Sequence, residues 1–92
     1  MFRSRHRADK THWAILRELK KRTVAIDIHN GPLGADILAV HVVTGDPVLI
    51  EAKRDAKAGL TPKEMALAAV FPRHWRRANT VEEALRAVGA IE

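Results

Sequence analysis

The sequence predicts a small single domain of the α/β class. Three observations lead to this prediction: apolar residues at helical spacing near the start, apolar and β-branched runs in the middle, and two threonine-initiated helix starts in the second half. A chain of 92 residues has the length of one domain, with no internal repeat or long linker. We expect the order helix, three strands, helix, short strand, helix over residues 9–92, preceded by a flexible basic tail over residues 1–8.

The first helix is expected over residues 10–22, with Asp9 as its N-cap. Its apolar stripe, with residues three and four apart, comprises His12, Ile15, Leu16 and Leu19. Residues 23–28 then change to the β-branched alternation that is typical of a strand. The segment that begins at His29 contains asparagine, glycine and proline and therefore ends this strand.

Two nearly continuous apolar runs, residues 36–43 and 48–53, indicate a pair of buried strands. The sequence Thr44-Gly45-Asp46-Pro47 between them predicts a hairpin turn, with His41 as a strand residue beside it. Together with residues 23–28, these runs predict a three-stranded meander that helices cover on at least one face.

A second helix is expected to begin at Thr61. Thr61 suits the N-cap, Pro62 the first helical position, and Glu64 the third position of a capping box. This helix should run to about Val70, and the weak alternation of residues 73–78 predicts a short fourth strand.

The sequence Thr80-Val81-Glu82-Glu83 repeats the capping-box pattern and opens a last helix. The apolar face of this helix comprises Val81, Ala84, Leu85 and Val88. Gly89 is placed to end it.

The composition limits the possible classes of function. Without cysteine, the chain has no disulfides or thiolate metal sites, so any metal is held by carboxylate, carbonyl, water or histidine, which favours Mg²⁺ or Mn²⁺ over structural zinc. No apolar run approaches the ~20 residues of a membrane span, and the first residues lack a signal-peptide core. We therefore expect a cytoplasmic protein without a membrane partner.

The net charge of +5 favours a polyanionic partner, although a basic surface also serves solubility. The residues expected to bind nucleic acid are Arg3, Arg5, Arg7, His29, Asn30, Arg54, Lys57, Arg73, Arg76 and Arg77. Trp75 lies among arginines and is either a base-stacking residue or, like Trp13, a core or interface residue. Charge alone does not distinguish DNA from RNA.

Three charged residues are expected to converge beside the predicted sheet. Glu51 and Lys53 point to the same side because strand side chains alternate, and Asp36 begins the neighbouring strand. Core packing does not call for a desolvated acid, and a divalent cation is the simplest compensation for it. We expect Asp36, Glu51 and the backbone carbonyl of Ala52 to be metal ligands and Lys53 to act electrostatically on a phosphate.

An acid-x-Lys triplet alone is weakly specific, because two other triplets in the chain match it. Glu18-Leu19-Lys20 lies in the first helix, and Asp55-Ala56-Lys57 lies in a predicted turn. Only Glu51-Ala52-Lys53 ends an apolar strand and has an acid fifteen positions upstream at the start of a neighbouring strand. The alternative interpretation is a surface salt-bridge cluster at the strand ends.

Three segments resemble the PD-(D/E)xK nuclease superfamily, and within it the small stand-alone VRR-NUC-like proteins common in phages. They are Gly34-Ala35-Asp36, Ile50-Glu51-Ala52-Lys53 and Leu60-Thr61-Pro62-Lys63-Glu64. Residues 79–85 resemble the closing segment of these proteins, so the resemblance extends from Asp9 to Gly89. It implies a restriction-endonuclease-like core and a metal-dependent DNA endonuclease, similar to homodimeric Holliday-junction resolvases, in a bacterial or phage-infected cell.

The resemblance also implies roles for individual residues. Asp36 and Glu51 would be metal ligands, Lys53 the catalytic lysine, and Glu64 a match to an acid or glutamine of the following helix, although its capping box alone explains it. Ala35 replaces the proline that gives the superfamily its name, and this position supplies no ligand.

Ala14 stands where the first helix of many relatives carries a metal-binding glutamate. Glu18, one turn later, and His12 are the accessory candidates for this role, whereas His41 and His74, like His12, are single histidines without ligand spacing.

The function expected from the sequence is a Mg²⁺- or Mn²⁺-dependent endonuclease that cleaves branched or junction DNA as a homodimer. One alternative is a catalytically weak or inactive nucleic-acid-binding module on the same fold. The other is a phage protein-interaction subunit that uses its basic face on an acidic partner.

Overall fold

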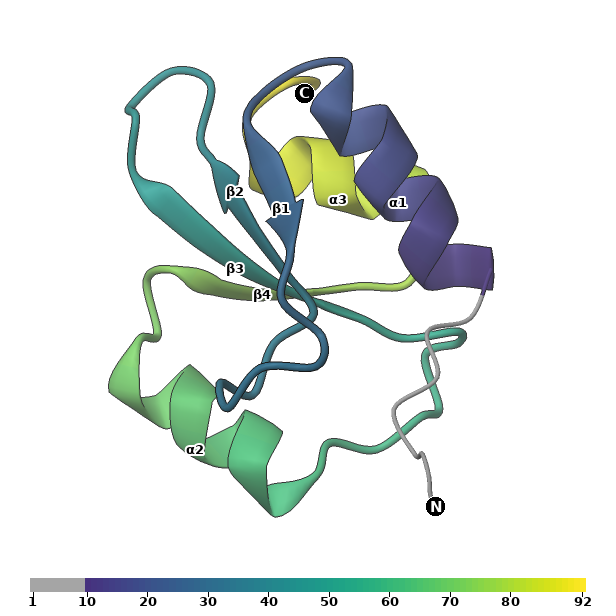
Figure 1. Ribbon diagram of the computed structural model, residues 1–92, viewed down its shortest axis with the longest axis vertical. Helices are drawn as coiled ribbons and strands as arrows, with labels where there is room; N and C mark the ends of the chain where they lie inside the picture. Colours follow the sequence, from purple (N-terminus) through teal and green to yellow (C-terminus); the bar gives the residue numbers. More distant parts are fainter. Residues whose placement is uncertain (1–9) are drawn as a thin grey trace.

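The computed structural model describes residues 10–92 and has three helices and one four-stranded mixed sheet (Figure 1). The elements are α1 (Lys10–Lys20), β1 (Ala25–Asp27), β2 (Ile37–Val40), β3 (Pro47–Ala52), α2 (Pro62–Val70), β4 (Trp75–Ala78) and α3 (Val81–Ala87). This arrangement confirms the predicted α/β class. The expected N-cap Asp9 and the tail over residues 1–8 lie outside the described residues.

The sheet has the strand order β1-β2-β3-β4. Antiparallel pairing joins β1 to β2 and β2 to β3, which confirms the predicted meander. β4 then pairs parallel to β3, because the chain crosses over through α2 before it returns to the sheet. In this pairing Glu51 of β3 lies beside Arg77 of β4.

Helices cover both faces of the sheet. α1 and α3 lie together on one face, and α2 lies on the other (Figure 1). The main core between the sheet and the first pair of helices includes Ile15, Leu19, Ile37, Ile50 and Val88. The smaller core under α2 contains Ala35, Leu49 and Leu67. Because β3 alternates between these two cores, its inner residues are buried on both sides.

Several elements are shorter than the sequence suggests. α1 ends at Lys20 and not at residue 22, because the backbone N–H groups of Arg22 and Thr23 both bond to the Leu19 carbonyl in a turn. β1 covers Ala25–Asp27 and not residues 23–28. The Thr23 hydroxyl donates to the Val40 carbonyl at 2.7 Å, so a side chain takes the place of strand pairing there.

The hairpin loop begins earlier than predicted, and His41 is a loop residue and not a strand residue. β2 ends at Val40, and the Nδ1 atom of His41 accepts the backbone N–H groups of Val43 and Thr44, both at 3.2 Å. Gly89 packs against this ring with a φ of +75°, and a Cβ there would lie 2.5 Å from the imidazole. The close approach fixes the loop against the end of α3.

The helix starts behave largely as predicted. Thr61 and Glu64 form the complete capping box of α2. At α3 only half of the motif forms: Thr80 accepts from the Glu83 backbone N–H, whereas the Glu83 carboxylate accepts the N–H of Asn79 at 2.6 Å. α2 ends at Val70, as expected.

Candidate functional site

The backbone of β3 holds Asp36 in place. The Asp36 backbone N–H donates to the Ile50 carbonyl at 2.9 Å, and its Oδ2 atom accepts the Ala52 backbone N–H at 2.9 Å. Two bonds to residues on either side of Glu51 therefore keep the Asp36 carboxylate beside the Glu51 side chain. Ala52, expected to offer its carbonyl to a metal, contributes its N–H to this arrangement.

Glu51 is a buried acid, only 4% exposed. Burial raises the pKa of its carboxyl to about 9, and the negative charge and hydrogen bond of Asp36, together with Glu64, act in the same direction. Without a further cation, Glu51 is therefore protonated at neutral pH. Its side chain lies on the α2 side of the sheet, where an apolar residue would otherwise fill the space.

Lys53 completes the cluster of Asp36, Glu51, Lys53 and Glu64, which we call the acid cluster. Its Nζ atom lies 2.9 Å from Glu64 Oε1 and 3.6 Å from Glu51 Oε2. Burial lowers the pKa of Lys53, but the hydrogen bond with Glu64 and the nearby carboxylates outweigh burial, and the net pKa is raised. Lys53 is thus a permanent cation, which suits electrostatic stabilisation rather than proton abstraction.

Glu64 serves both as a helix cap and as a member of the acid cluster. Its Oε1 atom accepts the Thr61 backbone N–H at 2.9 Å and also receives the Lys53 ammonium. Burial raises the pKa of Glu64, but the hydrogen bonds from Lys53, Thr61 and Glu51, together with the charge of Lys53, outweigh burial, and the net pKa is lowered. A Cβ at Gly34 would lie 2.6 Å from the Lys63 carbonyl, so glycine lets the start of α2 approach the segment that carries Asp36.

The acid cluster has the chemistry of a site for a hard divalent cation. Asp36 and Glu51 offer carboxylate oxygens, the ligands that Mg²⁺ and Mn²⁺ prefer. A cavity of about 100 Å³ opens beside them, lined also by Glu64 and His29. With Glu51 ionised, three carboxylates would face one ammonium, and a dication would balance the excess negative charge.

The structure does not bring the first helix into the acid cluster. Glu18 pairs with Lys21 at 2.9 Å on the surface of α1. His12 is buried at 2% exposure and pairs with Asp27, not with Asp36 or Glu51. Ala14 has no polar side chain. Glu18 and His12, the two accessory candidates on α1, therefore do not supply the acid that the acid cluster lacks from this helix.

A second cluster of polar side chains, formed by His12, Asp27 and His29, was not predicted from the sequence. The Oδ1 atom of Asp27 lies 3.1 Å from His12 Nε2 and 2.6 Å from His29 Nδ1. Burial raises the pKa of Asp27, but hydrogen bonds from His29 outweigh it, and the pKa is lowered. The Asp-x-His spacing of Asp27 and His29 is a local signal for part of this group, whereas His12 is fifteen positions away in sequence.

The basic residues expected to bind nucleic acid divide between the two ends of the sheet. Arg54 and Lys57 are exposed in the segment that follows Lys53, and Arg77 donates to the Asp55 carbonyl of this segment at 2.8 Å. Asn30 is exposed in the loop that leads toward Asp36. Positive charge therefore lies at the same end of β3 as the acid cluster.

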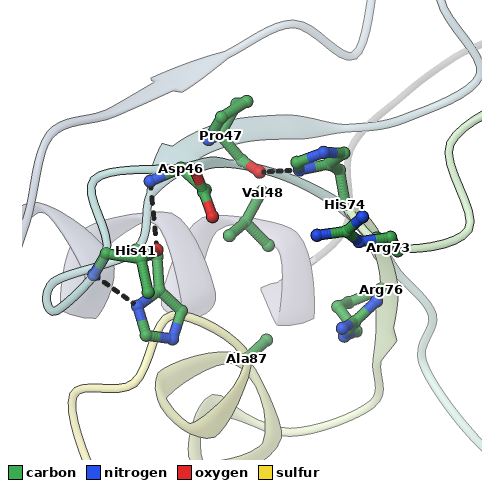
Figure 2. Close-up of a pocket in the computed structure, with 9 residues that line it drawn as sticks. His41, Asp46, Pro47, Val48, Arg73, His74, Arg76 and Ala87 are labelled. Atoms are coloured by element: carbon green, nitrogen blue, oxygen red, sulfur yellow. Dashed lines mark hydrogen bonds between the residues drawn. The ribbon is translucent and has the colours of Figure 1, made fainter.

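Arg73 precedes β4 at the other end of the sheet. Arg76 pairs with Ile50 within β4, but its guanidinium turns toward this end and donates to the Pro72 carbonyl at 3.3 Å. With His41 and His74 the two arginines line a separate cavity of about 150 Å³ (Figure 2). His74 Nδ1 lies 2.9 Å from the carbonyl of Pro47, the first residue of β3. The predicted residues Arg3, Arg5 and Arg7 lie outside the described residues.

The two tryptophans have different environments. Trp75 packs against the smaller core, and its indole N–H donates to the Gly34 carbonyl at 3.4 Å, as expected of a core residue. Trp13 is 44% exposed, and its ring contacts those of His12 and His29 edge to face. Trp75 could stack on a base only if it left the smaller core and lost its hydrogen bond to Gly34.

Comparison with protein-family models, curated proteins and solved structures finds no match for this chain. Within residues 10–92, no helix has both the length and the apolar character needed to cross a bilayer. The fold and the local geometry therefore carry the functional argument.

Proposed function

We propose that this chain is a Mg²⁺- or Mn²⁺-dependent DNA endonuclease of the PD-(D/E)xK type, built on a restriction-endonuclease-like core and directed to branched or junction DNA. The observation that carries the proposal is the buried Glu51 carboxyl. It lies beside Asp36 and Glu64 and within 3.6 Å of Lys53, at the end of a core strand. A buried acid surrounded by other acids is costly for stability alone and is typical of a functional site.

Each residue has a role in this proposal. Asp36 and Glu51 would hold the metal ion, which would supply charge neutralisation at the phosphate and activation of a water molecule. Glu64 positions the Lys53 ammonium, and Lys53 stabilises the negative charge that develops on the phosphate. Arg54, Lys57 and Arg77, at the same end of the sheet, are placed to attract the DNA backbone.

A cleavage assay tests the proposal. Junction and linear DNA are incubated with the protein in Mg²⁺, Mn²⁺ or EDTA, and the cleavage rates of Glu51→Ala and Lys53→Ala are compared with the wild type. We expect metal-dependent cleavage that falls at least about 100-fold in both variants. Lys20→Ala is the matched control, because Lys20 carries the same charge, ends another acid-x-Lys triplet and is exposed on α1. Equal cleavage by Lys53→Ala and Lys20→Ala would contradict the assigned site.

A nucleic-acid-binding module without cleavage activity is the second candidate function. It is favoured by the first helix, where Glu18 pairs with Lys21 and Ala14 offers no ligand, so the acid cluster lacks an acid from α1. DNA binding at low salt without cleavage in either metal would support this candidate. No DNA binding at low salt would contradict both candidates.

A symmetric homodimer is part of the nuclease proposal, because resolution of a junction needs two cuts and a second copy supplies the second site. The described part of the chain exposes apolar side chains on and after α2, including Met65, Val70 and Phe71. Light scattering during size-exclusion chromatography, with and without junction DNA, measures the mass. A mass equal to one copy of the chain, in the presence of junction DNA that is being cleaved, would contradict the dimer.

A further inference from the structure

We propose that His12, Asp27 and His29 form a second metal site, selective for a transition-metal ion of the Zn²⁺ type. The three residues come from α1, from the last position of β1 and from the turn that follows β1. One ligand atom from each lies within 4.8 Å of the others. This site, which we call the histidine site, is separate from the acid cluster in its ligands and in its chemistry.

The distances already resemble those between ligands of one ion. Asp27 Oδ1 lies 3.1 Å from His12 Nε2 and 2.6 Å from His29 Nδ1. At Zn–N and Zn–O bonds of about 2.0–2.1 Å, neighbouring ligands of a tetrahedral ion are about 3.3–3.4 Å apart. To admit the ion, the two Asp27 pairs would widen by less than about 1 Å, and the nitrogen atoms of His12 and His29, which lie within 4.8 Å of each other, would come to a similar separation. The nitrogen atoms that bind the ion would be unprotonated, as ligands must be.

The packing holds both imidazole rings without the metal. The ring centroids of His12 and His29 are 5.0 Å apart, and Trp13 contacts both, at 4.6 Å and 5.7 Å. His12 is 2% exposed, whereas the side chains of His29 and Asp27 are 13% and 28% exposed. The histidine site thus has a buried back and an open side at which water can complete a tetrahedral shell.

The donor set distinguishes the histidine site from the acid cluster. Two imidazole nitrogens and one carboxylate oxygen suit Zn²⁺, Co²⁺ or Ni²⁺, whereas Mg²⁺ prefers oxygen ligands alone. Because His29 also lines the cavity beside Asp36 and Glu51, an ion at the histidine site would join α1 to the wall of that cavity. We infer a structural role, in which the ion fixes the loop after β1 relative to α1.

Titration of untagged full-length protein with Co²⁺ tests the histidine site, with visible absorption and calorimetry as readouts. The titration is done on Glu51→Gln protein in excess Mg²⁺, which removes the acid cluster as a competing site. We expect one equivalent of Co²⁺ with tetrahedral d–d absorption, and quenching of Trp13 fluorescence. In the same background His29→Ala and Asp27→Asn should weaken binding at least about tenfold, while His41→Ala and His74→Ala should not.

Failure of this proposal is distinguishable from failure of the nuclease proposal. Binding that is absent, or unchanged in His29→Ala and Asp27→Asn, overturns the histidine site whatever the cleavage assay gives. These two positions are more exposed than His12, so the variants should fold, and far-ultraviolet circular dichroism checks this. A rise in Tm with Zn²⁺ that both variants lose would support the structural role.

Discussion

Replacing Glu51 by glutamine should change how stability depends on pH. In the folded protein the pKa of Glu51 is raised from 4.5 to about 9 by burial, Asp36 and Glu64. Between these values the folded state retains a proton that the unfolded chain releases, so the free energy of unfolding falls as pH rises. Glutamine has the shape of the protonated acid and carries no such proton, so the variant should lack this part of the slope.

The magnitude follows from the interval between the unfolded pKa and the working pH. From 4.5 to 7 the interval is about 2.5 pH units, and at about 1.4 kcal/mol per unit it corresponds to about 3 to 4 kcal/mol. Glu51→Gln should therefore gain about 3 to 4 kcal/mol over the wild type between pH 4.5 and pH 7 in metal-free buffer. Below pH 4.5 both side chains are neutral and the difference should stay constant.

Urea unfolding followed by circular dichroism at several pH values measures this difference. Mg²⁺ should stabilise the wild type at pH 7 and have little effect on Glu51→Gln, because the variant lacks the ionisable ligand. The exposed Glu82→Gln on α3 is the control and should give a curve parallel to the wild type. Parallel curves for wild type and Glu51→Gln would refute the assignment of a buried, protonated acid.

Three further predictions concern the acid cluster, the cap of α2 and the hairpin loop. Mg²⁺ binding at pH 7 should release about one proton, because the metal displaces the proton of the Glu51 carboxyl. Calorimetry in buffers of different ionisation enthalpy would detect the release; its absence would mean that Glu51 is already ionised. Thr61→Ala should lower the free energy of unfolding in urea by about 1 kcal/mol, because Thr61 caps α2. Thr44→Ala, at an exposed position, is the control and should cost less than half as much; equal effects would contradict the capping role. Gly89→Ala should lower Tm by several degrees in a thermal melt, because of the positive φ and the contact with His41; an unchanged Tm would show that the loop adapts.

The acid cluster illustrates how far a local pattern reaches. The alternation of strand side chains placed Glu51 and Lys53 on one side, and the two-strand spacing brought Asp36 near them, because both follow from short-range geometry. Glu64 was explained by its capping box, yet its carboxylate also holds Lys53. That second contact depends on the path of the crossover between β3 and β4 and has no signal within α2 itself.

The errors also have physical causes. His41 was predicted to lie in a strand because it continues an apolar run. Its imidazole accepts two backbone N–H groups of the residues that follow, and the loop therefore begins at His41. Arg73 and Arg76 were grouped with Arg77 by sequence, whereas their side chains line the cavity beside His41 and His74, and Arg77 bonds to the segment that follows Lys53.

The α/β class, the meander, the helix starts and the convergence of Asp36, Glu51 and Lys53 could be predicted from local patterns, because periodicity, capping and turn chemistry act over a few residues. The depth at which Glu51 is buried and the approach of Glu64 to Lys53 depend on tertiary packing. The contact of His12 with Asp27 and His29 depends on it as well. Desolvation and ligand distances depend on segments far apart in the chain, so they are set when the helices and the sheet pack together.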